Sequence, residues 1–238
     1  MVSAVGVSRV RLDDPMSVYE VIKKLPGIAA VRDRSKALAM LDAVLCPEWD
    51  FRYFSFDSRW SQGEEMASMR DGSGNDYAIV FAAAGAYAQA CNHESPMTPS
   101  HLSPPAPWPG LFDSVPEVFR SYVEEPAFAD HNGLPRATVC LWREHSDSQW
   151  KCGNVDVPDE EMDDADGAEW LFDVLVGGSA EAYQTFAEDY YEVTLDLSAV
   201  QDIWDLKPLT QQGVSALNPK ATLSGLAEDI AQIGYPTA

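Results

Sequence analysis

The stretch "SMRDGSGNDYAIVFAAAGAYAQA", residues 68–90, decides the fold of this chain. Its first part ends an amphipathic run, and residues 71–75 then combine two glycines with Asp and Asn, which tolerate the positive φ of tight turns. The apolar residues 77–90 follow, and an interruption near Gly85 divides them into two strands. The stretch therefore predicts consecutive antiparallel strands joined by short turns, which is the beginning of a meander.

Strand patterns also flank this stretch on both sides. Residues 49–56, "WDFRYFSF", alternate apolar and polar side chains as a half-buried strand does. Residues 136–144 and 148–155 form a later hairpin across "HSD", and we expect Trp142 and Trp150 to make a cross-strand aromatic pair in the core. Together these patterns predict an antiparallel β-sheet of about five to six strands.

Helical spacing occurs at both ends of the chain. Residues 16–45 predict two helices, the first of which stops at Pro26. Residues 167–236 repeat amphipathic patterns separated by Gly, Pro, Asn or Asp, which predicts a helical C-terminal third. Helices at the ends of an antiparallel sheet make an α+β fold. We expect residues 16–238 to form one α+β domain, with residues 1–15 as an extension or a disordered N-terminus.

A proline-rich loop interrupts the region of residues 49–155, which is otherwise mainly antiparallel sheet. Residues 95–113 contain six prolines and show no periodicity. A loop of this length inside a compact domain is usually functional or covers another surface. A short helix over residues 116–124 should follow, with Val118, Phe119 and Tyr122 pointing inward.

The charge of the chain restricts its partners. There are 38 acidic and 16 basic residues, which give a net charge of -22 and a pI near 4.3. Residues 144–238 hold twenty acids and three bases, a net charge of -17, whereas residues 1–45 have a net charge of +2. Such a surface repels nucleic-acid phosphates and anionic membranes, so we expect neither as a partner, and its natural partner is a basic protein.

The acid is densest in residues 156–170, "DVPDEEMDDADGAEW", with eight carboxylates in fifteen residues. Three interpretations remain open: a solvated acidic loop, a surface for a cationic partner, and a specific metal site. For the second we expect the rim of the partner surface to consist of Asp159, Glu160, Glu161, Asp163, Asp164 and Asp166, with Trp170 as an aromatic anchor.

The glycine-rich turn of residues 71–75 also has the oxygen spacing with which a calcium loop begins. The sixth position is Asp76 where a glycine is needed, and the twelfth is Ala82 where a bidentate glutamate belongs. No Gly-Lys-Ser/Thr is present to bind phosphate. A hairpin turn remains, and we expect Arg70 at its base to pair with a carboxylate such as Glu94 and hold the strand ends together.

Residues 91–95, "CNHES", bring Cys, His, Glu and Ser together. Cys91 and His93 are one residue apart and so lie on the same side of a strand, and His101 follows on the proline-rich loop, which makes these three weak candidates for zinc ligands. The chain has no paired CxxC and no HExxH, and we expect no resident metal or cofactor. An alternative function is that of a hydrolase or a metal-dependent enzyme, whose catalytic side chains would have to meet at one site. The candidate residues for such a site are Arg70, Asp71, His93 and Glu94.

The four cysteines never approach a CxxC spacing, and nothing near the N-terminus has the pattern of a secretory signal. No apolar window has the length needed to span a membrane. We therefore expect a cytoplasmic protein with reduced thiols.

Several strings resemble a group of uncharacterised bacterial acidic α+β proteins: "LAMLDAVLCPEW", "MASMRDGSGNDY", "NHESPM", "WPGLFDSVP", "AEDYYEV" and "IAQIGYP". The resemblance runs from about Leu25 to the end of the chain. In that group the strand before "HES" tends to carry Lys-Gly and an aromatic, whereas residues 88–91 here read Ala-Gln-Ala-Cys. The group has no established activity, so the resemblance implies no catalytic residues. Small acidic bacterial proteins of this kind often look like the immunity proteins of toxin systems.

Our interpretation is a non-enzymatic acidic binding protein, an immunity-type antitoxin that neutralises a basic partner protein such as a toxin. The enzyme described above is one alternative. A structural or regulatory domain without either activity is the other.

Overall fold

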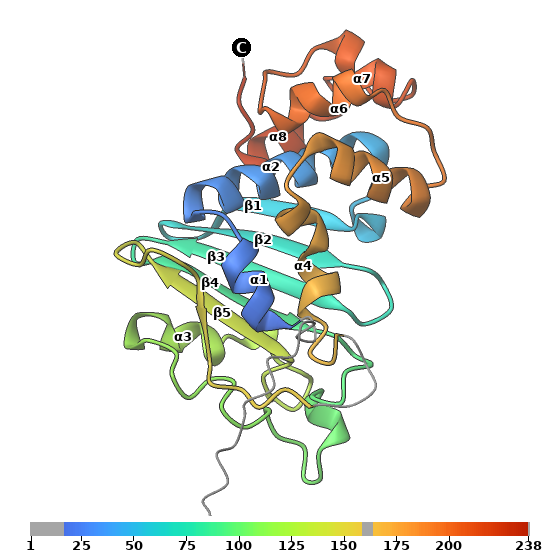
Figure 1. Cartoon of the computed structure of the whole chain (residues 1–238). Coiled ribbons are helices and arrows are strands. Elements are labelled where there is room, and N and C mark those ends of the chain that lie inside the picture. Colours follow the sequence, from blue (N-terminus) through green and yellow to red (C-terminus); the bar gives the residue numbers. More distant parts are fainter. Residues whose placement is uncertain (1–16, 159–163, 238) are drawn as a thin grey trace, which may run out of the picture.

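The computed structural model describes residues 17–158 and 164–237 (Figure 1). At its centre lies a six-stranded antiparallel sheet in which each strand pairs with its neighbours in sequence. The strands are β1 (Phe54–Ser61), β2 (Glu64–Arg70), β3 (Asp76–Ala82), β4 (Gly85–Cys91), β5 (Val139–Glu144) and β6 (Lys151–Cys152). The predicted meander of residues 68–90 is confirmed by the pairing of β2 with β3 and of β3 with β4.

Helices precede and follow the sheet, which confirms the α+β class. They are α1 (Val18–Lys24), α2 (Ile28–Leu45), α3 (Arg120–Val123), α4 (Ala168–Gly177), α5 (Ala180–Tyr190), α6 (Leu197–Trp204), α7 (Gln211–Leu217) and α8 (Ala227–Ile233). Short 3-10 helices are η1 (Trp49–Phe51), η2 (Pro99–His101), η3 (Glu117–Phe119) and η4 (Pro126–Phe128). No helix among the described residues is both long enough and apolar enough to cross a bilayer.

The two faces of the sheet have separate hydrophobic cores, because successive side chains of a strand point to opposite faces. Ile79 of β3 packs into the larger core with α1, α2 and the C-terminal helices. The next residue, Val80, packs into a smaller core with Met97 and Leu111 of the proline-rich loop and Phe119 of η3. Figure 1 shows the same division, with α1, α2 and α4 on one side of the sheet and α3 on the other. The proline-rich loop therefore covers a sheet face.

The prediction that residues 49–56 form a strand is wrong for its first half. Trp49–Phe51 is the 3-10 helix η1, and β1 begins only at Phe54. The cause is Arg52, whose buried guanidinium pairs with Asp229 of α8 at 2.5 Å and also donates to two backbone carbonyls. The chain has to turn to place Arg52 there, so alternating hydrophobicity was not enough to define the strand.

The expected aromatic pair across the last hairpin is also absent. Trp142 of β5 lies opposite Lys151 and belongs to the smaller core, whereas Trp150 belongs to the larger one and donates from Nε1 to the carbonyl of Pro26 at 2.6 Å. The two indoles thus lie on opposite faces of the sheet. Val118 does not point inward as predicted but is 53% exposed, while Phe119 is fully buried.

Candidate functional site

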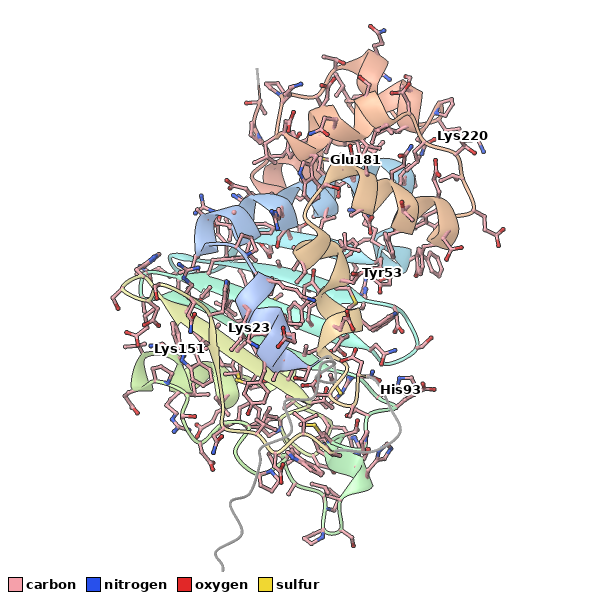
Figure 2. The ribbon with its side chains drawn as sticks, in the orientation of Figure 1. Lys23, Tyr53, His93, Lys151, Glu181 and Lys220 are labelled. Carbon is pink, nitrogen blue, oxygen red and sulfur yellow. The ribbon has the colours of Figure 1, made fainter. Side chains whose placement is uncertain are left out.

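A pocket of about 380 Å³ opens between η1, the turn that joins β2 to β3, and the end of α5. Three segments that are far apart in the sequence therefore meet at one place. The lining residues are Cys46, Asp50, Phe51, Arg52, Arg70, Asp71, Gly72, Tyr190 and Tyr191. Tyr53, labelled in Figure 2, packs its ring against that of Tyr190, one of these lining residues, with the centroids 4.9 Å apart.

The β2–β3 turn forms one wall of the pocket and is held by Asp71. One carboxylate oxygen of Asp71 accepts from the backbone N–H groups of Ser73 at 2.7 Å and Asn75 at 3.1 Å, and the other accepts from Asn75 Nδ2 at 2.6 Å. Gly72 and Gly74 have φ values of 77° and 107°, which other residues rarely adopt. The predicted hairpin turn is therefore present, and it fixes a carboxylate at the pocket wall.

Arg70 does not form the expected pair with Glu94. Its guanidinium lies 3.9 Å from the centroid of the Trp49 ring, and its Nη2 donates to the carbonyl of Trp49 at 2.6 Å. Glu94 is instead 4.0 Å from His93 Nε2. The cation thus fastens η1 to the end of β2 by a cation–π contact and a hydrogen bond.

Aromatic side chains form the opposite wall. The ring of Tyr190 packs against Tyr53, Phe186 and Tyr191, with centroids 4.9, 5.4 and 4.9 Å away. Tyr190 is nevertheless 41% exposed, and Phe51, which also lines the pocket, is 66% exposed. Because three rings hold Tyr190 in place, it presents a fixed aromatic surface to solvent.

A fully buried carboxylate, Asp42 of α2, lies behind Tyr191. It accepts hydrogen bonds from the hydroxyls of Tyr183 at 2.7 Å and Tyr191 at 2.9 Å, and from the N–H of Phe54 at 2.7 Å. Burial raises the pKa of Asp42 to about 6, although these three hydrogen bonds act in the opposite direction. Sequence reasoning missed Asp42, and its signal was an acid within the apolar run "LAMLDAVL".

The carboxylates near the pocket act on the tyrosines beside it. The pKa of Tyr190 is raised by burial and then by the charges of Asp42 and Asp71. Burial also raises the pKa of Tyr53. The negative charge of Asp71 and, more weakly, that of Asp173 of α4 raise it further.

The start of α4 contains the described part of the predicted acidic rim. Asp166 is completely buried and accepts from the N–H groups of Val18 and Ala168 at 2.8 and 2.9 Å, so its placement on an exposed rim was wrong. Asp164 caps the helix by accepting from the N–H groups of Glu169 and Trp170. Trp170 is 46% exposed. The predictions for Asp159, Glu160, Glu161 and Asp163 lie outside the described residues.

Trp170 and Asp173 are three residues apart on α4 and therefore share one helix face. Neither residue lines the pocket. We call the exposed aromatic and acidic side chains at and beside the pocket the aromatic–acidic surface. It comprises Trp49, Asp50, Phe51, Asp71 and Tyr190.

The residues proposed for an enzyme do not converge into one site. His93 is tied to the turn, since its N–H donates to Asn75 Oδ1 at 2.9 Å and its Nδ1 lies 2.8 Å from the same oxygen. Asn75 also donates to Asp71, so His93 and Asp71 share a hydrogen-bonded neighbour. Arg70, in contrast, faces Trp49. Neither His93 nor Glu94 lines the pocket. These four candidate residues therefore do not form a catalytic arrangement.

The three weak zinc candidates are also placed separately. Cys91, at the end of β4, is buried, and burial raises the pKa of its thiol. His93 is exposed in the turn that follows β4. His101 Nδ1 lies 2.9 Å from the carbonyl of Ser95. Within residues 17–158 and 164–237, no three His, Cys, Asp or Glu side chains are arranged to hold a metal ion.

A second pocket, of about 240 Å³, lies on the sheet between β2, β3, β4 and η4. Its polar side chains already bond to the protein. Arg136 Nη2 donates to Asp76 at 2.7 Å, and Gln89 Nε2 donates to the carbonyls of Phe128 and Arg136, both at 3.0 Å. This pocket thus offers fewer free polar groups than the one beside Tyr190.

Comparison of the chain with protein-family models, with curated proteins and with solved structures found no match.

Proposed function

We propose that this protein is a non-enzymatic binding protein that docks a basic protein partner through the aromatic–acidic surface. The observation that supports this most directly is the clustering of exposed aromatic rings with carboxylates around one pocket. Trp49, Phe51 and Tyr190 are 48%, 66% and 41% exposed. Aromatic residues are enriched at protein interfaces, where they act as anchors.

Charge adds selectivity to this surface. A protein with a net charge of -22 attracts basic partners over distances beyond contact and repels acidic ones. Most of the acidic side chains stay in water after docking, so they speed association more than they strengthen the complex. Association should therefore weaken as salt screens the charges.

The proposal extends to an immunity-type role, in which the complex masks the basic surface of a toxin. Its supports are the resemblance of the strings "MASMRDGSGNDY", "NHESPM" and "IAQIGYP" to the bacterial acidic group, and a surface whose chemistry suits binding more than catalysis.

Affinity capture from native lysate of the source cells, at low and at high salt, tests the proposal. Phe51→Ser removes an exposed ring from the aromatic–acidic surface, and Val118→Ser is a matched control because Val118 is 53% exposed in another part of the chain. We expect a basic protein that is retained at low salt by the wild type and the control, and lost with Phe51→Ser. Retention by both variants, or capture of acidic proteins only, would contradict the proposal.

A further inference from the structure

The pocket beside Tyr190 has the size and the wall chemistry of a site for one side chain. Its volume of about 380 Å³ lies at the low end of the range for ligand pockets. Phe51 and Tyr190 expose aromatic surface on one part of the wall, and the carboxylates of Asp50 and Asp71 lie on another. Aromatic faces and carboxylates together attract a cation, which can stack on the first and pair with the second.

Two arginines also line the pocket, but each already has partners within the protein, so the preference of the pocket for a cation remains. Arg52 is buried and pairs with Asp229 through two hydrogen bonds of 2.5 and 3.2 Å, while its other donors reach the carbonyls of Cys46 and Pro47. Arg70 stacks on Trp49 and donates to its carbonyl. Neither contact of Arg70 neutralises its charge, but the carboxylates of Asp50 and Asp71 outnumber this one cation, so the balance that remains at the pocket is negative.

Asp71 keeps hydrogen-bonding capacity for a ligand. Each carboxylate oxygen can accept two hydrogen bonds. One oxygen of Asp71 accepts two from the turn, but the other accepts only one, from Asn75 Nδ2. The turn holds the carboxylate in place before any ligand arrives, which reduces the ordering cost of binding. Asp50 is exposed on η1 and offers a second carboxylate.

Arginine suits this wall better than lysine does. A guanidinium is planar, stacks on aromatic rings and presents several donors to carboxylates, whereas an ammonium is a compact and strongly hydrated charge. The protein contains the same arrangement within its own chain, since the Arg70 guanidinium lies 3.9 Å from the Trp49 ring centroid. We propose that the pocket between η1, the β2–β3 turn and α5 binds one arginine side chain of the basic partner, between the aromatic wall and the carboxylates of Asp50 and Asp71. This inference rests on the proposed function.

Titration of the ¹⁵N-labelled protein with N-acetyl-arginine amide, followed by NMR, tests the inference. The same titration uses N-acetyl-lysine amide and the uncharged N-acetyl-glutamine amide as comparison probes. We expect saturable shifts of the Gly72 and Tyr191 amide signals with the arginine probe, weaker binding of the lysine probe, and no saturable binding of the glutamine probe. Equal binding of the arginine and lysine probes, or of the glutamine probe, would refute an arginine site.

Two variants and a control locate the binding. Asp50→Asn removes an exposed charge at constant shape, and Tyr190→Leu removes the aromatic face but keeps an apolar side chain. Each should weaken binding of the arginine probe by about two- to fivefold, as expected for one cation–π or surface-charge contact. Asp113→Asn removes an exposed charge on the proline-rich loop and should leave the affinity unchanged. Unchanged affinity in both pocket variants would overturn the assignment.

The lysate capture distinguishes this inference from the proposed function. A protein that retains a basic partner through Phe51 but does not bind the arginine probe would refute the arginine site alone. A protein that binds the probe at this pocket but captures no basic partner would refute the proposed function alone.

Discussion

Substitution of asparagine for Asp42 is expected to remove a pH-dependent loss of stability from this protein. The Asp42 carboxyl is fully buried, and burial raises its pKa from 3.8 to about 6. A shift of about two units in the pKa corresponds to about 3 kcal/mol in the free energy of unfolding. Asparagine has nearly the same shape, still offers one oxygen to its donors, and does not ionise, so it should not show this dependence.

The sign of the effect follows from which state holds the proton. Between pH 3.8 and about 6 the folded protein still binds a proton at Asp42 that the unfolded chain has already released. Acid therefore favours the folded state in this window. The contribution is fully present below the unfolded pKa, declines as the pH rises, and is lost above about pH 6, where the folded protein has to bury a charge.

Urea unfolding of both proteins at a series of pH values between about 4 and 7.5 measures the effect. Burial also raises the pKa of Asp166 to about 6, but this group is common to both proteins and cancels in the difference between them. The free energy of unfolding of Asp42→Asn, relative to that of the wild type, should rise by about 2 kcal/mol across this range, because a small part of the effect is already present at about pH 4. Curves that stay parallel would show that hydrogen bonds from Tyr183, Tyr191 and Phe54 stabilise the carboxylate as much as burial destabilises it, and would refute our reasoning.

Two further predictions concern the packing that supports the pocket. Arg52→Ala should lower the free energy of unfolding by about 3 kcal/mol, because it leaves the partly buried Asp229 without its cation, whereas Lys207→Ala breaks only an exposed pair and should have little effect in the same urea titration. Gly85→Ala should cost at least about 2 kcal/mol, since a Cβ there would lie 2.1 Å from a carbonyl oxygen of β5. Gly63→Ala, at a φ of 79° with open space around it, should cost only about 1 kcal/mol in thermal unfolding, and equal losses for the two glycines would contradict this account.

The sequence was sufficient to predict the sheet because the relevant signals are local. The turn of residues 71–75 and the apolar strands after it depend on backbone preferences and on alternation, both of which are visible in a short window. The helices of the C-terminal third are likewise separated by local signals. The failure at residues 49–51 had a non-local cause, since Arg52 is drawn toward Asp229, which lies 177 residues later in the chain.

The candidate site was less predictable for the same reason. Asp71 and Arg70 were noticed in the sequence, but their neighbours at the pocket come from η1 and from the end of α5, which only the tertiary fold brings together. Asp42 and Tyr191 are 149 residues apart. An acid in an apolar helix and two adjacent tyrosines were each visible, but no spacing rule joins them.

The distribution of ion pairs explains why the acidic excess is available to a partner. Among the ion pairs of the described residues, one joins a base that precedes residue 144 to an acid that follows residue 143. This pair is Arg52–Asp229. Two of the three basic side chains of α2, Arg32 and Lys36, contact Glu65 of the sheet instead. The third, Arg34, donates to the backbone carbonyl of Leu175 and not to a carboxylate. Among the described residues, most acidic side chains after residue 143 therefore have no internal cation, and the mutual repulsion of these carboxylates costs stability. A basic partner would relieve that repulsion, so binding should raise the stability of this protein most at low salt, where the repulsion is least screened.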